Sequence, residues 1–120
     1  MKKNAAVLLA LFFSFGCFAT AAEPGTILHV VTVKWRADST LQQQQAALDG
    51  VRRMAAEVKG IRNVWIRKIK VQPSDYDTAF AMEFENKAAF EAYTISEAHK
   101  AWEKLYLPIR EESRTQDITN

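Results

Sequence analysis

Apolar and polar side chains alternate from residue 27 to residue 35, which read ILHVVTVKW. Successive side chains of a β-strand point to opposite faces of a sheet. One face would carry His29, Val31, Val33 and Trp35, and the other would carry Leu28, Val30, Thr32 and Lys34. Because both faces are largely apolar, the pattern predicts a central strand that is covered on both sides.

A helical period follows this strand. The apolar positions that share one stripe of the helix are Leu41, Leu48, Val51, Ala55 and Val58. Ser39 and Gln42 have the spacing of a capping box, in which both side chains satisfy free backbone N–H groups. We expect Gly60 to end the helix, because glycine accepts the positive φ found at many helix ends.

Two further strands are predicted, at residues 63–71 and 77–85. In the first of these, Trp65 and Ile69 share a face, and Pro73 breaks the pattern. The apolar face of the second carries Phe80, Met82 and Phe84.

Two short helices and a polar strand complete the chain. Asn86 is a typical cap for a helix that runs to residue 93, and Ser96 for a second helix over residues 97–107. Residues 114–119 are polar and predict a fourth strand at an edge of the sheet.

The predicted order β-α-β-β-α-β places the fold in the α+β class, as a ferredoxin-like arrangement with an antiparallel sheet. In this arrangement the helices cover one face of the sheet. The other face still carries apolar side chains such as Leu28 and Val30, which a monomer would expose to water. A second copy packed sheet against sheet is the simplest cover, so we expect a homodimer.

Residues 1–21 have the pattern of a secretory signal peptide. Lys2 and Lys3 precede an apolar run over residues 5–15, and the sequence ATA at residues 19–21 resembles a cleavage site. The apolar run is too short for a comfortable membrane span, so no stable span is expected after cleavage. We therefore expect a periplasmic or secreted protein, exported from a bacterial cell.

Two other interpretations of this segment stay open. In the first, the segment is retained as an N-terminal anchor. In the second, Cys17 is lipidated. Gly16 suits a lipoprotein signal, whereas Ser14 stands where leucine is usual.

Cleavage would change the charge balance of the chain. The full sequence holds 16 basic and 14 acidic side chains, and loss of Lys2 and Lys3 leaves 14 of each. A balanced domain has no electrostatic footprint for nucleic acid, so no nucleic-acid partner is expected. Cys17 is the one cysteine, and its removal excludes disulfides and thiol chemistry from the mature domain.

The two histidines of the chain are the candidates for chemistry. His29 is either an acid or base in an apolar pocket, or a neutral core residue that donates one ring N–H to a neighbour. His99 either pairs with Glu103, one helical turn on, or lies opposite His29 across a pocket. No histidine spacing typical of a metal site is present, so we assign neither a metal nor another cofactor.

Three segments occur along the chain in this order: ILHVVTVKW, DYDTAFAMEFEN and AYTISEAHKAWEKLYLPI. Together they resemble the stress-responsive A/B barrel (Dabb) domain over residues 26–119. The resemblance implies a ferredoxin-like subunit that dimerises through its sheet into a dimeric α/β barrel. It also implies a pocket between the sheet and the helices of one subunit, approached by His29, Tyr93 and His99.

The chain departs from the family pattern at two positions. The family includes stress-induced plant proteins, polyketide cyclases and many bacterial proteins without an assigned activity. Thr78 stands where the cyclases carry a histidine that acts as a general base. Ser96 stands where the second-helix motif often begins with histidine, so that His99 alone remains of this motif.

Three functions stay open from the sequence. The favoured one is a stress-associated protein that binds a small apolar or aromatic ligand in the pocket. The alternative is a cofactor-free enzyme, polyketide-cyclase-like or of related proton-transfer chemistry, with His29 and His99 as catalytic residues. The third is a purely structural dimer whose pocket is filled by side chains. The ligand-binding residues expected for the first function are Val31, Val33, Trp35, Thr78, Tyr93 and Trp102.

Overall fold

The structure, a computed structural model, describes residues 24–68 and 70–120. The predicted signal peptide, with Cys17, and the predicted position of Ile69 lie outside these residues. The strands are β1 (Ile27–Trp35), β2 (Ile61–Trp65), β3 (Thr78–Phe84) and β4 (Arg110–Thr119). The helices are α1 (Leu41–Glu57), α2 (Lys87–Thr94), α3 (Glu97–Tyr106) and the 3-10 turn η1 (Leu107–Ile109).

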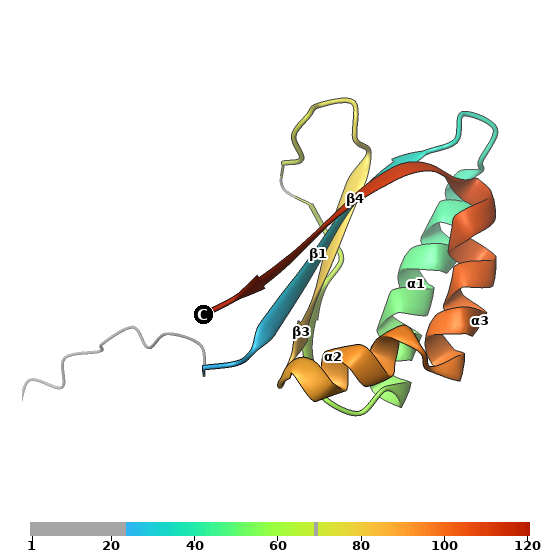
Figure 1. The fold of residues 1–120 in the computed structure, drawn as a ribbon. Helices are drawn as coiled ribbons and strands as arrows, with labels where there is room; N and C mark the ends of the chain where they lie inside the picture. The colour runs from blue at the N-terminus through green and yellow to red at the C-terminus, as the bar shows by residue number, and fades with distance from the viewer. Residues whose placement is uncertain (1–23, 69) are drawn as a thin grey trace, which may run out of the picture.

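The four strands form one antiparallel sheet in the order β2-β3-β1-β4. Helices α1 and α3 lie side by side against one face of the sheet, and α2 runs across one end of it (Figure 1). This arrangement confirms the ferredoxin-like α+β fold that the sequence predicts.

The hydrophobic core lies between the helices and the sheet face that they cover. The alternation in β1 is confirmed, because Val31, Val33 and Trp35 are buried there. The other large core residues of the sheet and helices are Phe80, Met82, Phe84, Val51, Met54, Tyr93, Trp102 and Tyr106. Burial of each such side chain stabilises the fold by roughly 1.5–3 kcal/mol relative to exposure.

Helix α1 begins one residue later than the sequence predicts. The Thr40 hydroxyl accepts a hydrogen bond from the Gln43 N–H at 3.1 Å, and Gln43 Oε1 accepts from the Thr40 N–H at 2.8 Å. The capping box predicted at Ser39 and Gln42 is therefore wrong. The Ser39 hydroxyl instead donates to the Arg36 carbonyl at 2.7 Å, in the turn that leads from β1 into the helix.

The caps at the start of the other two helices agree with the sequence. Asn86 accepts a hydrogen bond from the Ala89 N–H, and Ser96 accepts one from the His99 N–H, so that both cap their helices as predicted. Gly60 has the predicted positive φ, +93°, but the prediction that it ends α1 is wrong, because the helix ends at Glu57 and Val58 is its C-cap.

Strand β2 is shorter than predicted, since it ends at Trp65 rather than at residue 71. It pairs with β3 at an edge of the sheet, and the positions that follow include Arg67, Lys68 and Lys70, all exposed. Charged side chains of this kind limit pairing at a sheet edge. The apolar alternation of residues 65–71 therefore does not extend the strand.

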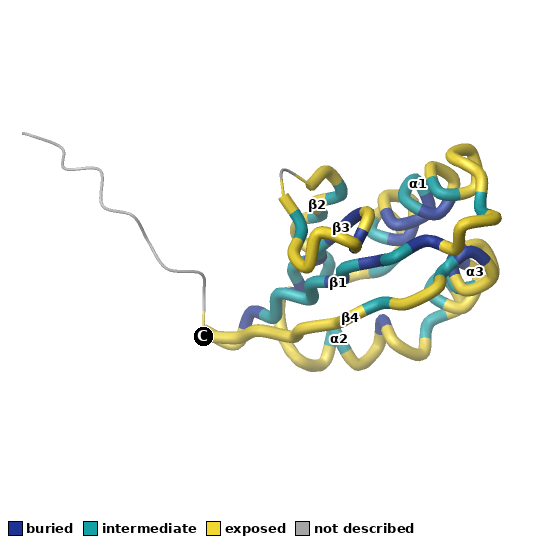
Figure 2. The backbone as a smooth tube through the Cα atoms, turned by 90° about the horizontal axis from the view of Figure 1, so that it is seen from above, coloured by how far each residue is buried: buried dark blue, intermediate teal, exposed yellow. Residues whose placement is uncertain are grey.

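Strand β4 is longer than predicted, since it begins at Arg110 rather than at residue 114. It pairs with β1 along nearly its whole length, because the backbone N–H and C=O groups of the buried β1 need partners on that side. Figure 2 shows β4 as the exposed edge beside the more buried β1. The predicted edge position is confirmed.

The second face of the sheet has no helix over it among the described residues (Figure 1). Two of the large hydrophobic residues exposed on this face are Trp65, at 50%, and Ile118, at 52%. Within residues 24–68 and 70–120, none of the helices has the length and apolar character to span a membrane.

Candidate ligand-binding cavity

A cavity of about 160 Å³ lies between the β1–β4 side of the sheet and the C-terminal helices. The strand residues that line it are His29, Val31, Phe80, Arg110, Ser113 and Thr115. The residues from α2, α3 and η1 are Tyr93, His99, Trp102, Glu103, Tyr106 and Leu107. Aromatic and aliphatic side chains share this lining with polar and charged ones, and small-molecule sites combine apolar walls with convergent polar groups.

His29 is held by a carboxylate that the sequence analysis did not identify. The register of β1 and β4 pairs His29 with Asp117, and its Nδ1 lies 2.6 Å from Asp117 Oδ1. The side chain of His29 is 13% exposed, whereas that of Asp117 is 45% exposed. Because an ionised carboxylate only accepts hydrogen bonds, we assign the ring proton to Nδ1, which leaves a lone pair on Nε2.

Aromatic rings surround His29 on its helix-facing side. The His29 ring centroid lies 5.5 Å from that of Phe90, 6.0 Å from that of Tyr93 and 6.4 Å from that of Phe84. Burial raises the pKa of Tyr93 well above its usual range, with the charge of Glu103 acting in the same direction. Tyr93 therefore stays neutral at physiological pH, as a donor or acceptor of hydrogen bonds.

His99 lines the same cavity from α3. Its ring centroid lies 4.6 Å from that of Tyr93, so that Tyr93 contacts both histidines. The Nδ1 atom of His99 is buried without a hydrogen-bond partner in the described part of the chain, and Glu103 Oε1 lies 3.9 Å away. The two arrangements expected for His99, beside Glu103 and across a pocket from His29, therefore occur together.

A second set of polar groups lies at the η1 end of the cavity. The Arg110 guanidinium lies over the Tyr106 ring, 5.5 Å from its centroid, and donates to the Ser113 hydroxyl at 3.2 Å. The Tyr106 hydroxyl is buried and makes no hydrogen bond of standard geometry within the described residues, although Ser113 and Arg110 lie close enough to lower its pKa. Burial raises the pKa of Tyr106, while the nearby Ser113 and Arg110 act in the opposite direction.

The cavity brings together five of the residues that the sequence predicts for a site: His29, Val31, Tyr93, His99 and Trp102. Val33, Trp35 and Thr78 are buried but do not line it. Trp35 packs edge-on against Tyr106, and Thr78 is the strand partner of Val33. The proposed roles of all eight in catalysis or ligand binding stay predictions.

The contribution of β4 to the cavity is not predicted from the sequence. Ser113, Thr115 and Asp117 alternate with residues of the opposite face, but a polar strand gives no hydrophobic signal that fixes its register. The strand predicted at residues 114–119 is too short to show this alternation, which becomes visible only when the strand begins at Arg110. The pairing of Asp117 with His29, however, is visible only in the folded sheet.

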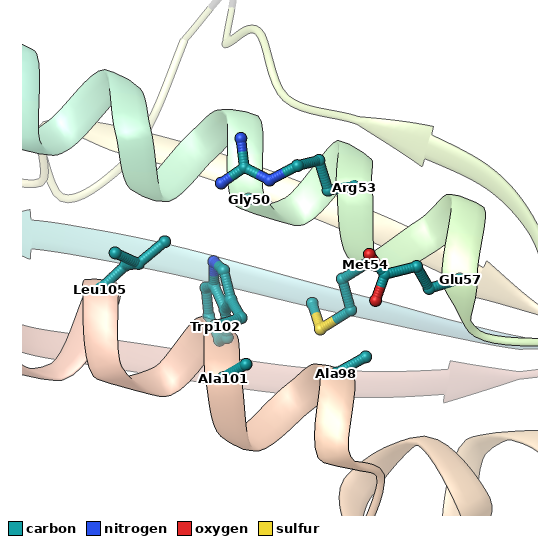
Figure 3. Close-up of a pocket in the computed structure, with 8 residues that line it drawn as sticks. All are labelled: Gly50, Arg53, Met54, Glu57, Ala98, Ala101, Trp102 and Leu105. Carbon is teal, nitrogen blue, oxygen red and sulfur yellow. The ribbon is translucent and has the colours of Figure 1, made fainter.

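A separate groove of about 110 Å³ lies between α1 and α3 (Figure 3). Trp102 lies beneath Gly50 in this groove and also lines the histidine cavity, so that its ring separates the two spaces. The Trp102 indole N–H donates to the Ala47 carbonyl at 2.9 Å. Arg53 and Glu57 lie at the α1 side, and no histidine lines the groove. We assign this groove to helix packing.

The structure contains no cluster of three or more potential metal-ligating side chains in the part of the chain that it describes. The two acidic residues that could have joined the histidines in a metal site have other contacts. Asp77 accepts from the Trp35 backbone N–H at 2.8 Å. Glu83 lies on the open face of the sheet, where it accepts from Asn63.

Comparison with known proteins gives one family. The sequence matches the stress responsive A/B barrel domain, Dabb, over residues 27–120. No curated protein matches the sequence.

Several solved structures share the fold. A Dabb family protein from Mesorhizobium loti is 23% identical, with a TM-score of 0.68 over 80% of this chain and 97% of its own. A dimeric ferredoxin-like protein of unknown function from Thermobifida fusca is 16% identical, with a TM-score of 0.72 over 85% and 97%. The hydroxynitrile lyase from Passiflora edulis is 12% identical, with a TM-score of 0.74 over 82% and 95%. At these identities the likeness concerns the fold.

Proposed function

Because the chain belongs to the stress-responsive A/B barrel domain family, we propose that it is an exported homodimer that binds a small aromatic or apolar molecule. The ligand lies in the cavity between His29 and His99, and the protein serves a stress-associated role. Dimeric relatives and the uncovered apolar face of the sheet support the homodimer. The lining of the cavity supports the ligand class.

The observation that carries the proposal is the pair of buried polar atoms without partners, His99 Nδ1 and the Tyr106 hydroxyl. A buried polar group that lacks a hydrogen bond costs about 1–3 kcal/mol. Both residues line one cavity of about 160 Å³, and an apolar cavity of about this size accommodates one benzene ring. A single-ring ligand with polar substituents fits both the volume and the unpaired groups.

Ligand binding is tested with benzamide, a neutral single-ring probe. We expect the melting temperature to rise with benzamide concentration, because a ligand that binds only the folded state stabilises it. Thr115→Trp places a large ring in the cavity from the exposed strand β4 and should remove the response. Gln42→Trp, on the exposed side of α1, is the control that should retain it. A wild-type protein whose melting temperature responds to neither benzamide nor its anionic analogue benzoate would refute the proposal.

A second function, cofactor-free proton transfer, is favoured by the His29–Asp117 pair. Asp117 holds Nδ1–H, so the Nε2 lone pair is available to take a proton from a ligand in the cavity. The charge of Asp117 would stabilise the imidazolium that forms. Tyr93, neutral because burial raises its pKa, would donate a hydrogen bond to an oxygen that gains negative charge. The Passiflora edulis relative is itself a lyase.

Proton transfer is tested by the exchange of the methyl hydrogens of acetophenone for deuterium in heavy water, followed by NMR. The base removes a proton from carbon and the enolate takes a deuteron from solvent, so no co-reactant is needed. We expect His29→Gln to remove the acceleration and Asp117→Asn to reduce it at least tenfold, with melting temperatures that show both variants folded. Equal rates for wild type and His29→Gln would exclude this function and leave binding.

We propose that the protein is exported, because residues 1–21 have the pattern of a secretory signal peptide. The intact mass of protein isolated from the exported fraction should correspond to a chain that begins at residue 22. A full-length mass would support a retained anchor. A lipid adduct on a chain that begins at Cys17 would support a lipoprotein.

A further inference from the structure

The two ends of the cavity differ in chemistry because of a β-bulge. The β1–β4 register pairs Val33 with Ser113 and Lys34 with Glu112, but then Trp35 with Arg110, so that Glu111 is skipped. A bulge changes the direction in which the neighbouring side chains of the strand point. Arg110 therefore lines the cavity, whereas Glu111 forms an ion pair with Lys34 at 3.1 Å.

Arg110 is a cation without an anion. In the described residues no carboxylate lies within ion-pair distance of its guanidinium. The acidic groups of the cavity region already lie beside the histidines, Asp117 beside His29 and Glu103 beside His99. Arginine stays charged at any physiological pH, and its planar donors match the two oxygens of a carboxylate.

Two hydroxyl groups lie at the same end of the cavity. Ser113 contacts the guanidinium, and the buried Tyr106 hydroxyl, close to both, makes no hydrogen bond of standard geometry in the described structure. A guanidinium with two hydroxyl donors is a suitable set for an oxyanion. The Trp102 ring lies between this set and His99, since its centroid is 4.4 Å from that of Tyr106 and 5.8 Å from that of His99.

We propose that the ligand is a small aromatic carboxylate, whose carboxylate is bound by Arg110, Ser113 and Tyr106 and whose ring lies toward the histidines. This inference rests on the proposed binding function and adds the ligand's charge and orientation to it. Asp117, the strand partner of His29, lies four residues along β4 from Ser113, which corresponds to roughly 13 Å of strand. Such a ligand therefore presents its far end, not its carboxylate, to His29.

The test compares benzoate with benzamide, which has the same ring and a neutral head group, by isothermal titration calorimetry. We expect wild-type protein to bind benzoate at least tenfold more tightly than benzamide. Arg110→Gln should remove this preference by weakening benzoate alone. Arg114→Gln is the matched control, because Arg114 belongs to the same strand but lies over Tyr76 outside the cavity, and it should keep the preference.

Each result decides between the two proposals. Benzamide binding that Thr115→Trp removes, without a preference for benzoate, would retain the binding site and overturn the carboxylate inference. A benzoate preference that survives Arg110→Gln would overturn it as well. Failure of both compounds to bind would overturn the inference together with the proposed function.

Discussion

His29 acquires a defined chemical state from one neighbour, Asp117. An isolated histidine in a β-strand gives no indication of which nitrogen carries its proton. The 2.6 Å contact between Nδ1 and the carboxylate fixes the tautomer and directs the basic nitrogen away from β4. Without this contact, nothing on β4 would fix which nitrogen of the ring carries the proton.

This assignment predicts the tautomer of His29 in solution. Nitrogen–proton correlation NMR of the imidazole rings should show His29 in the Nδ1–H form. Asp117→Asn should shift the ring toward a mixture of tautomers, since an amide both donates and accepts. Asp49→Asn, on α1, should leave the ring signals unchanged. A wild-type ring in the Nε2–H form would contradict the assignment.

Gly50 is a position at which packing requires a residue without a side chain. A Cβ at this position would lie 2.7 Å from Cδ1 of Trp102, whose ring is stacked on Tyr106 with centroids 4.4 Å apart. Glycine to alanine in a helix normally stabilises by about 0.5–1 kcal/mol. Here overpacking costs about 1–3 kcal/mol, so we expect Gly50→Ala to lower the free energy of unfolding. Chemical denaturation measures the sign, and a more stable variant would contradict this account.

The elements follow from the sequence wherever hydrophobic period and capping chemistry agree. The order of strands and helices, the buried face of β1 and β3, and the caps at Asn86 and Ser96 are all legible in the residues. The start of α1 is not, because Ser39 and Thr40 are equally suited to cap a helix. The choice between them depends on the turn at Arg36, whose backbone N–H donates to the distant Ile109 carbonyl at 2.9 Å.

The assignment of Thr40 as the N-cap of α1 predicts different losses of stability for substitutions at Thr40 and at Ser39. Thr40→Ala should reduce the free energy of unfolding by about 1 kcal/mol, because the Gln43 N–H loses its partner. Ser39→Ala should cost less, since Ser39 bonds the Arg36 carbonyl and the Gln44 side-chain amide but no free N–H of the helix. Urea denaturation of both variants gives the comparison, and a larger effect at Ser39 would reverse the assignment.

The candidate site is less predictable than the fold. His29, Tyr93 and His99 are found from the sequence because the family resemblance points to them, whereas Asp117 and Arg110 depend on the β1–β4 register and its bulge. A polar edge strand carries no hydrophobic alternation to fix its register. The partners of the histidines therefore emerge only when the sheet is formed.

At the scale of the whole molecule, the uncovered sheet face predicts the assembly. We expect the protein to be a dimer at micromolar concentration and Trp65→Glu to shift it to a monomer, because the indole is half exposed on that face. Leu105→Glu, at a similarly exposed position on α3, should leave the dimer intact. Sedimentation velocity distinguishes the masses. A monomeric wild-type protein would contradict the assembly.

The most direct test of the central claim uses the two histidines as probes. They are the chain's only histidines and both line the cavity, so their imidazole signals report on this site alone. On titration with benzamide, the account predicts that both rings shift together, with one dissociation constant, and that Thr115→Trp abolishes the shifts. Imidazole signals that do not move, or that move equally in Thr115→Trp, would contradict a ligand site between His29 and His99.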